Sequence, residues 1–106
     1  MKTHDKYILK GQKVISEDDL MKWGRWFETA ERHVGDDTFG NVRVSTVFLG
    51  IDHSFGVGKP LLFETMIFGG KHDGYQDRYH TWKEAERGHK KALKFITLPS
   101  LGKEGV

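Results

Sequence analysis

Residues 42–70, VRVSTVFLGIDHSFGVGKPLLFETMIFGG, decide the fold of this chain. Two apolar runs rich in β-branched and aromatic residues flank a polar loop that contains glycine and proline. Such runs favour strands, and glycine and proline mark the connection between them. We therefore expect two antiparallel strands, about 41–50 and 61–68, joined by a ten-residue loop over 51–60.

A third strand and a helix follow this unit. The turn cluster GGKHDG, residues 69–74, leads into a more polar strand over about 75–80 that pairs with the second strand. In this register Glu64 lies opposite Arg78. The residues TWKE, 81–84, form a capping box that starts a helix over about 82–96.

The segment before this unit is predicted to be mainly helical. Ser16 is a good N-cap, and the acidic residues 17–19 suit the first turn of a helix over about 17–34. Apolar residues recur at helical spacing and predict a stripe that faces the core: Leu20, Trp23, Phe27, Ala30 and Val34. Gly35 ends the helix, and the acidic pair after it makes a polar turn.

Together these elements predict an α+β domain. A three-stranded antiparallel meander (about 41–50, 61–68 and 75–80) carries two helices (about 17–34 and 82–96) on one face. A short N-terminal extended segment, 7–15, is either two very short strands with a turn at Gly11 or one extended piece. The length suits a single domain over 1–106, with frayed ends at 1–6 and 98–106. The uncovered face of the sheet is free to bind a second copy, which predicts a homodimer.

Composition limits the classes of function. The net charge of +2 is too small to indicate nucleic-acid binding by itself. The chain has no cysteine, which excludes a thiolate nucleophile and a cysteine zinc site. Its apolar runs fall far short of the roughly 18 residues of a membrane-spanning helix. Because the N-terminus also lacks the apolar region of a signal peptide, we expect a cytoplasmic protein without membrane contact.

The loop over 51–60 is the strongest candidate site. It brings a carboxylate, an imidazole, a hydroxyl and an ammonium group onto glycine-softened backbone: Asp52, His53, Ser54 and Lys59. Such a set suits an anionic ligand, because backbone N–H groups can approach it closely. The residues GVGK do not form a Walker A motif, since the following Ser/Thr and helix are missing. We predict a recognition surface on this loop, with Trp26 and Tyr79 at its rim.

A structural role for the same loop is the alternative. Asp52 then makes an Asx turn, and Phe55 tucks under the loop as an anchor. Long loops in small domains are often functional, which keeps both interpretations open.

Acid–base catalysis is a further interpretation of these residues. Asp52 and His53 suggest a general acid and base, with Ser54 as the nucleophile. Adjacent side chains on extended backbone point to opposite sides, so Glu64 or His89 would have to complete such a site. For Glu64 we favour a cross-strand ion pair with Arg78.

The six histidines do not form a metal-binding pattern. No H-x-H or H-x-x-x-H spacing occurs, and Glu86-x-x-His89 occurs once, whereas di-iron bundles need two copies. We predict no metal and no cofactor. We expect His89 to be a hydrogen-bonded, partly buried residue on the apolar face of its helix.

Five cations lie along the other face of the helix over 82–96: Lys83, Arg87, Lys90, Lys91 and Lys94. We interpret them as a solvated face that complements the helix dipole. The alternative is contact with a phosphate backbone or with an acidic protein surface.

Three segments resemble a known family: VFLGIDHSF (47–55), LFETMIFGG (62–70) and TWKEAERGH (81–89). They resemble the patterns VFLG-x-DH-x-F, LFETM-x-FGG and TW-x-EAE-x-GH of small proteins met in tailed-phage and prophage genomes. The likeness covers most of the chain, beginning at WGRWFETAERHV, residues 23–34. It implies a phage accessory protein acting in the bacterial cytoplasm, and it transfers no catalytic residue.

Small phage accessory proteins usually act by binding. We therefore predict a non-enzymatic binder that contacts a host or defence protein, or a small anionic, nucleotide-like ligand. Its role would be to support phage propagation or to counter host defence. Two alternatives stay open: acid–base or metal-assisted hydrolysis of a phosphorylated substrate by Asp52, His53 and Glu64, and a structural role in the virion or in packaging.

Overall fold

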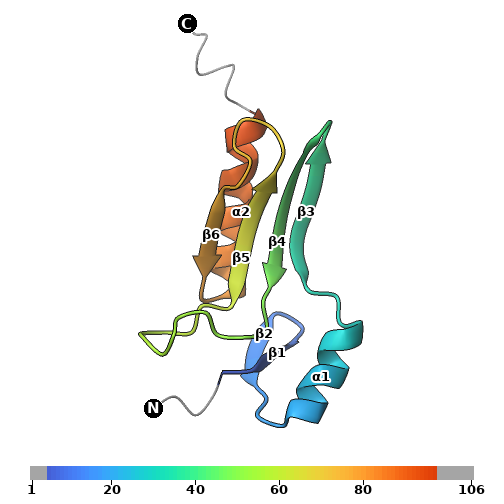
Figure 1. Ribbon diagram of the computed structural model, residues 1–106, viewed down its shortest axis with the longest axis vertical. Coiled ribbons are helices and arrows are strands. Elements are labelled where there is room, and N and C mark those ends of the chain that lie inside the picture. Colours follow the sequence, from blue (N-terminus) through green and yellow to red (C-terminus); the bar gives the residue numbers. More distant parts are fainter. Residues whose placement is uncertain (1–4, 98–106) are drawn as a thin grey trace, which may run out of the picture.

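The computed structural model describes residues 5–97. In chain order these residues form β1 (Tyr7–Lys10), β2 (Lys13–Ser16), α1 (Leu20–Thr29), β3 (His33–Phe39), β4 (Val42–Phe48), β5 (Phe63–Phe68), β6 (Gln76–Tyr79) and α2 (Trp82–Thr97). Strands β3 to β6 make one antiparallel sheet in the order β3-β4-β5-β6, and β1 and β2 make a separate hairpin. Figure 1 shows α2 along one face of the sheet, with the hairpin and α1 at its lower end. The α+β class is confirmed.

The predicted meander is present and is extended by one strand. β4, β5 and β6 correspond to the strands expected at 41–50, 61–68 and 75–80. Glu64 pairs with Arg78 in the register, as predicted. The prediction of three strands is wrong, because β3 adds a fourth strand beside β4.

α2 packs the side that carries its small residues onto the sheet. Ala85, Gly88, His89 and Ala92 are its buried residues. The main core lies beneath this helix and includes Val44, Phe48, Phe63 and Ile67, all 0% exposed. The helix predicted over 82–96 is confirmed, and so is its cap, since the Glu84 N–H donates to Thr81 Oγ1 at 3.1 Å.

The predicted helix over 17–34 is wrong at both ends. Asp19, rather than Ser16, caps α1, and its side chain accepts from the N–H groups of Met21 and Lys22 at 3.0 and 3.1 Å. Ser16 ends β2 instead. The helix ends at Thr29, and the chain then turns into β3.

Strand β3 replaces the last turn of that predicted helix and the polar turn predicted after it. Its sequence gives a weak strand signal, because Gly35 and the two aspartates after it are poor strand formers that interrupt the residues favouring a strand. Pairing with β4 stabilises the strand, and a bulge between His33 and Gly35 adjusts the register. Gly35 is required here, because a Cβ atom would lie 2.6 Å from the ring of His89.

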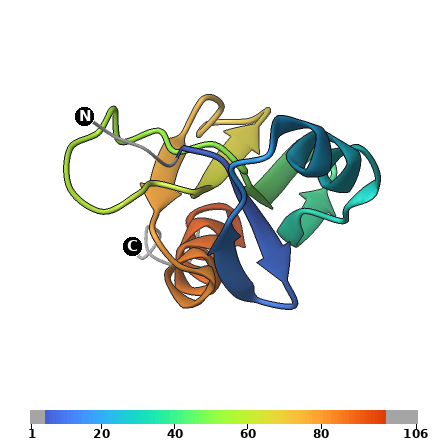
Figure 2. The same cartoon turned by 90° about the horizontal axis from the view of Figure 1, so that it is seen from below.

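The prediction that both helices cover one face of the sheet is wrong. α1 lies beside β1 beyond the end of the sheet, as the two perpendicular views in Figures 1 and 2 show. None of its residues is buried, and Leu20, expected in the core, is 61% exposed. Trp26 makes the link to the core, with its ring 5.7 Å from that of Phe48 in an edge-on contact.

The N-terminal segment is a hairpin, which settles the two interpretations left open for residues 7–15. Gly11 turns the chain with a φ of 63°, and β1 pairs with β2 along its whole length. Leu9 is buried in the core. The ends expected to fray fall largely on residues 1–4 and 98–106, which lie outside the described range. Neither α1 nor α2 is long and apolar enough to cross a membrane.

Candidate functional site

Asp52 holds the base of the loop over 51–60. Its Oδ1 accepts from the backbone N–H groups of Ser54 and Leu61 at 2.8 and 3.0 Å, and its Oδ2 accepts from Ser54 Oγ at 2.9 Å. The Asx turn is confirmed. Because one carboxylate joins both arms of the loop, Asp52 and Ser54 face the loop's own backbone.

The remaining polar residues of the loop do not converge on a common point. His53 Nδ1 lies 2.8 Å from the carbonyl oxygen of Ile51, so this ring also bonds within the loop. Lys59 is exposed on the other arm. The four residues proposed for an anionic site therefore divide into a loop clamp and an exposed cation.

The tip of the loop presents apolar side chains to solvent. Phe55 is 89% exposed and Val57 is 78% exposed. The prediction that Phe55 tucks under the loop is wrong, because its side chain is exposed; its backbone has a left-handed φ of 57°. Figure 2 shows the loop, in yellow-green, standing out from the body on the side opposite α1.

The three other predicted residues lie away from this loop tip. Tyr79 is in the core rather than at a rim, 8% exposed. Trp26 is half-buried against Phe48. Glu64 lies on the sheet face opposite α2, where its Oε2 is 3.0 Å from Arg78 Nε. The structure therefore does not assemble Asp52, His53 and Glu64 into one site.

A chain of polar side chains runs through the core beneath α2. Asp37 Oδ2 lies 2.7 Å from His89 Nε2, and His89 Nδ1 lies 2.7 Å from Thr46 Oγ1. Thr46 Oγ1 is 2.5 Å from Thr65 Oγ1, which accepts from the Tyr79 hydroxyl at 3.1 Å. The predicted hydrogen bonding of His89 is confirmed, and the residue is buried rather than partly buried. The two threonines and Asp37 were not predicted, because only long-range strand pairing brings them to His89.

One direction of donation satisfies this whole chain. With a neutral imidazole, His89 donates from Nε2 to Asp37, because a carboxylate accepts only. His89 Nδ1 then accepts from the Thr46 hydroxyl, which accepts from Thr65, which accepts from Tyr79. Burial raises the pKa of Tyr79 to about 12, so its hydroxyl keeps the proton that starts the chain.

The order Asp37–His89–Thr46 matches the roles of a hydrolytic triad, but the setting is different. A nucleophile has to reach its substrate, and Thr46 is 0% exposed, between α2 and the sheet. Asp37 is the accessible end, with 45% of its side chain exposed. The arrangement fixes α2 on the sheet and specifies the register of β3.

The outer face of α2 carries the predicted basic stripe. Lys83, Arg87, Lys90, Lys91 and Lys94 are all exposed. The same face carries the exposed Glu86, so the charge is not of one sign. Among the described residues no group of three or more His, Asp or Glu is placed to hold a metal ion.

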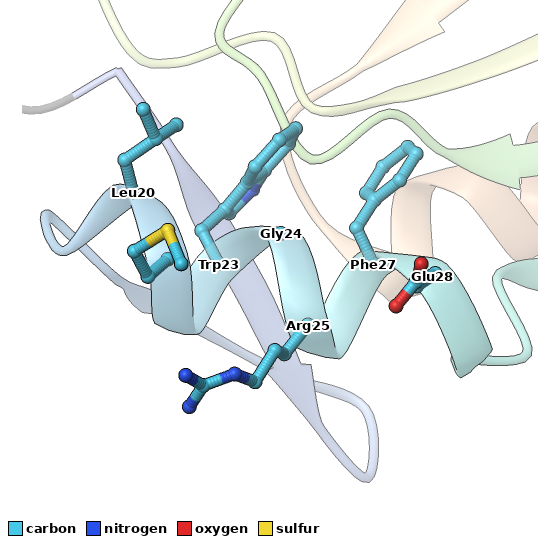
Figure 3. Close-up of a pocket in the computed structure, with 7 residues that line it drawn as sticks. Leu20, Trp23, Gly24, Arg25, Phe27 and Glu28 are labelled. Atoms are coloured by element: carbon cyan, nitrogen blue, oxygen red, sulfur yellow. The ribbon is translucent and has the colours of Figure 1, made fainter.

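A shallow apolar hollow on α1 is the feature that the sequence did not predict (Figure 3). Its centre is Gly24. Leu20, Trp23 and Phe27 form one flank, and Met21, Arg25 and Glu28 form the other. We call these seven residues the Gly24 face. The helical spacing of its apolar residues was visible in the sequence, but it was assigned to the core.

Comparisons with protein-family models, with curated proteins and with solved structures give no match to this chain. The functional argument therefore rests on the residues themselves.

Proposed function

We propose that this protein acts by binding another protein, and that the tip of the loop over 51–60 is its recognition element. The observation that carries the proposal is the exposure of Phe55, 89%, next to the 78% exposure of Val57. Two large apolar side chains held in solvent on one loop are typical of protein-binding surfaces. Aromatic side chains are also among the residues that contribute most to binding energy.

The backbone of the loop supports this role. A left-handed φ at a residue other than glycine is unfavourable by about 1–3 kcal/mol and persists where the surroundings enforce it. Phe55 has a φ of 57°, and the glycines on both sides of Val57 also have positive φ. The loop thus keeps an unfavourable backbone conformation at the residue whose aromatic ring is exposed.

The Asp52 clamp gives the tip a rigid base. Asp52 accepts three hydrogen bonds: two from Ser54 fix the start of the loop, and one from the Leu61 N–H ties that start to the end of the loop. A loop that is ordered before binding loses less conformational entropy on association, which raises affinity. On this proposal Asp52 and Ser54 position the tip, and Phe55 and Val57 make the contact.

The partner follows from the resemblance to small phage proteins. We propose a host or defence protein of the bacterial cytoplasm, and a role in phage propagation or counter-defence. An apolar loop tip favours a protein partner over a small anionic ligand, because the carboxylate and imidazole of the loop bond to its own backbone.

The experiment compares two variants of the same loop. Phe55→Asn removes the ring and suits the left-handed backbone, so the free energy of unfolding should stay equal or rise by about 1 kcal/mol. His53→Ala is the control, because it removes a polar group of the loop but leaves the apolar tip.

Cross-linked complexes are then isolated from phage-infected cells that produce each variant. We expect a partner captured by the wild type and by His53→Ala, and lost with Phe55→Asn. Capture of the same partner by folded Phe55→Asn would refute the proposal. Loss with His53→Ala alone would favour the polar groups, and with them the acid–base interpretation.

A further inference from the structure

The Gly24 face of α1, like the loop tip, keeps large apolar side chains exposed to solvent. α1 has apolar residues on two of its sides, yet none of its residues is buried. Leu20 and Met21 are 61% and 66% exposed. Trp23 and Phe27 are half-buried and stack on each other with ring centroids 4.8 Å apart. Figure 3 shows Leu20, Trp23 and Phe27 side by side along one edge of the helix.

Gly24, at the centre of this face, has no structural reason within the chain. Glycine in a helix interior is unfavourable by about 0.5–1 kcal/mol relative to alanine. A Cβ atom at Gly24 would meet nothing within 4 Å, and no positive φ is recorded for this residue. Glycine on the surface of a helix lets another backbone approach more closely than alanine does.

We infer that the Gly24 face binds the same face of a second copy, with the two α1 helices antiparallel and crossing at Gly24. The resulting dimer has a two-fold axis, the commonest symmetry of soluble homo-oligomers. This inference is independent of the proposed function of the loop, which stands on the opposite side of the molecule (Figure 2).

Charge complementarity selects a second copy as the occupant. Arg25 and Glu28 lie on the same flank of the face. In a two-fold pair of antiparallel helices each flank meets the same flank of the partner copy. Side chains on a helix lean toward its N-terminus, so Arg25 of one copy leans toward Glu28 of the other. The pairing occurs twice, because the axis makes it reciprocal.

The apolar flank is self-complementary in the same way. Leu20 at one end of the helix meets the region of Phe27 in the other copy, and Trp23 lies between them. Phe27 and Trp23 already have partners within the chain: the Arg32 guanidinium carbon lies 4.1 Å from the Phe27 ring centroid, and the Trp23 indole N–H donates to the carbonyl oxygens of Tyr7 and Gly50. The exposed edges of Leu20 and Met21 are therefore the surfaces that a second copy removes from water.

The uncovered face of the sheet, which the sequence favoured for dimerisation, is less suitable. Its residues include two ion pairs, Asp36 with Arg43 and Glu64 with Arg78. Covering these charges would remove their hydration, which opposes association. The Gly24 face of α1 carries neither of these ion pairs.

Sedimentation velocity of the full chain tests the inference. Protein concentrations from about 1 µM to about 1 mM cover dissociation constants typical of weak to moderate association. We expect a concentration-dependent dimer. Gly24→Gln should weaken it by at least about tenfold, because the added side chain occupies the crossing point. The monomer should become slightly more stable, because glutamine is the better helix former. Thr29→Gln is the control, since it places a glutamine side chain 140° around the helix from Gly24, and it should leave the dimer unchanged.

Charge reversal identifies the orientation of the pair. Arg25→Glu and Glu28→Arg should each weaken the dimer by about tenfold, since both reciprocal pairs become repulsive. The double variant, which restores both pairs with opposite sense, should recover the wild-type association. The inference is overturned if the protein stays monomeric over the whole concentration range. It is also overturned if Gly24→Gln leaves the dimer intact, or if the double variant does not recover wild-type association. In those cases the face remains for another partner, or the dimer uses another surface.

Discussion

Thr46→Val is the sharpest test of the polar chain beneath α2. Valine has nearly the shape of threonine, and Thr46 is 0% exposed in the middle of a strand. By burial and strand propensity alone the substitution should be neutral or stabilising. We expect the opposite, because the Thr46 hydroxyl accepts one hydrogen bond in the chain and donates the next.

The magnitude follows from the two groups that lose their partner. His89 Nδ1 loses the donor that lies 2.7 Å away, and the Thr65 hydroxyl loses the acceptor that lies 2.5 Å away. A buried polar group left without a partner costs about 1–3 kcal/mol. Thr46→Val should therefore lower the free energy of unfolding by about 2–4 kcal/mol. Thr46→Ser keeps the hydroxyl and loses one methyl group, which costs about 1 kcal/mol.

Urea unfolding followed by tryptophan fluorescence measures both values by linear extrapolation. Ser45→Ala is the control, because Ser45 precedes Thr46, lies on the opposite face of β4 and is not part of the hydrogen-bonded series from Tyr79 to Asp37. This substitution should lower the free energy of unfolding by less than about 1 kcal/mol. The reasoning fails if Thr46→Val is as stable as Thr46→Ser or more stable. That order would mean that shape and apolar burial, rather than the hydrogen-bonded chain, govern this site.

Three further predictions use neighbouring groups. Gly88→Ala should lower the free energy of unfolding by about 2 kcal/mol, because the new Cβ atom would lie 2.1 Å from the Tyr79 hydroxyl oxygen. Gly24→Ala should raise the free energy of unfolding by about 0.5–1 kcal/mol, because alanine is the better helix former and has open space there. Urea unfolding of both variants shows whether the two changes have opposite signs. The pKa of Tyr79 is raised from 10.0 to about 12, so its neutral form contributes stability that is complete below pH 10 and is lost as the pH rises through 12; Tyr79→Phe should flatten this alkaline loss in unfolding measurements. The Arg43 guanidinium holds the pKa of Asp36 below its usual value of 3.8, so Arg43→Gln should raise that pKa in a carboxyl titration followed by NMR.

The strands of the meander were predictable because their signals are local. Val42–Phe48 and Phe63–Phe68 are rich in β-branched and aromatic residues, and glycine turns bound them. β3 was not predictable in this way. The side of β3 that faces α2 presents Gly35 and Asp37. The partner of Asp37 is His89, which lies 52 residues further along the sequence. A strand that is stabilised by a distant histidine leaves no pattern in its own segment.

The helix prediction failed because two patterns coincide. Leu20, Trp23 and Phe27 have true helical spacing, and Val34 continues that spacing by chance from within β3. The periodicity was correct for α1 but did not indicate which surface it meets. An amphipathic helix is compatible with packing against its own sheet and with packing against a second molecule. The sequence therefore predicted the apolar face correctly. Trp23 of this face bonds to the backbone of the chain itself, whereas Leu20, expected in the core, is 61% exposed.

The two helix glycines separate these possibilities, although the sequence alone treats them alike. Gly88 is buried at the contact between α2 and β6, where any Cβ atom would collide with Tyr79. Its role is completed inside the chain. Gly24 has open space around it and lies at the centre of an apolar face that carries both an arginine and a glutamate. A residue that lowers helix stability without an internal contact to explain it is accounted for by a contact with another molecule, and the reciprocal charges on the same face make a second copy the partner that fits.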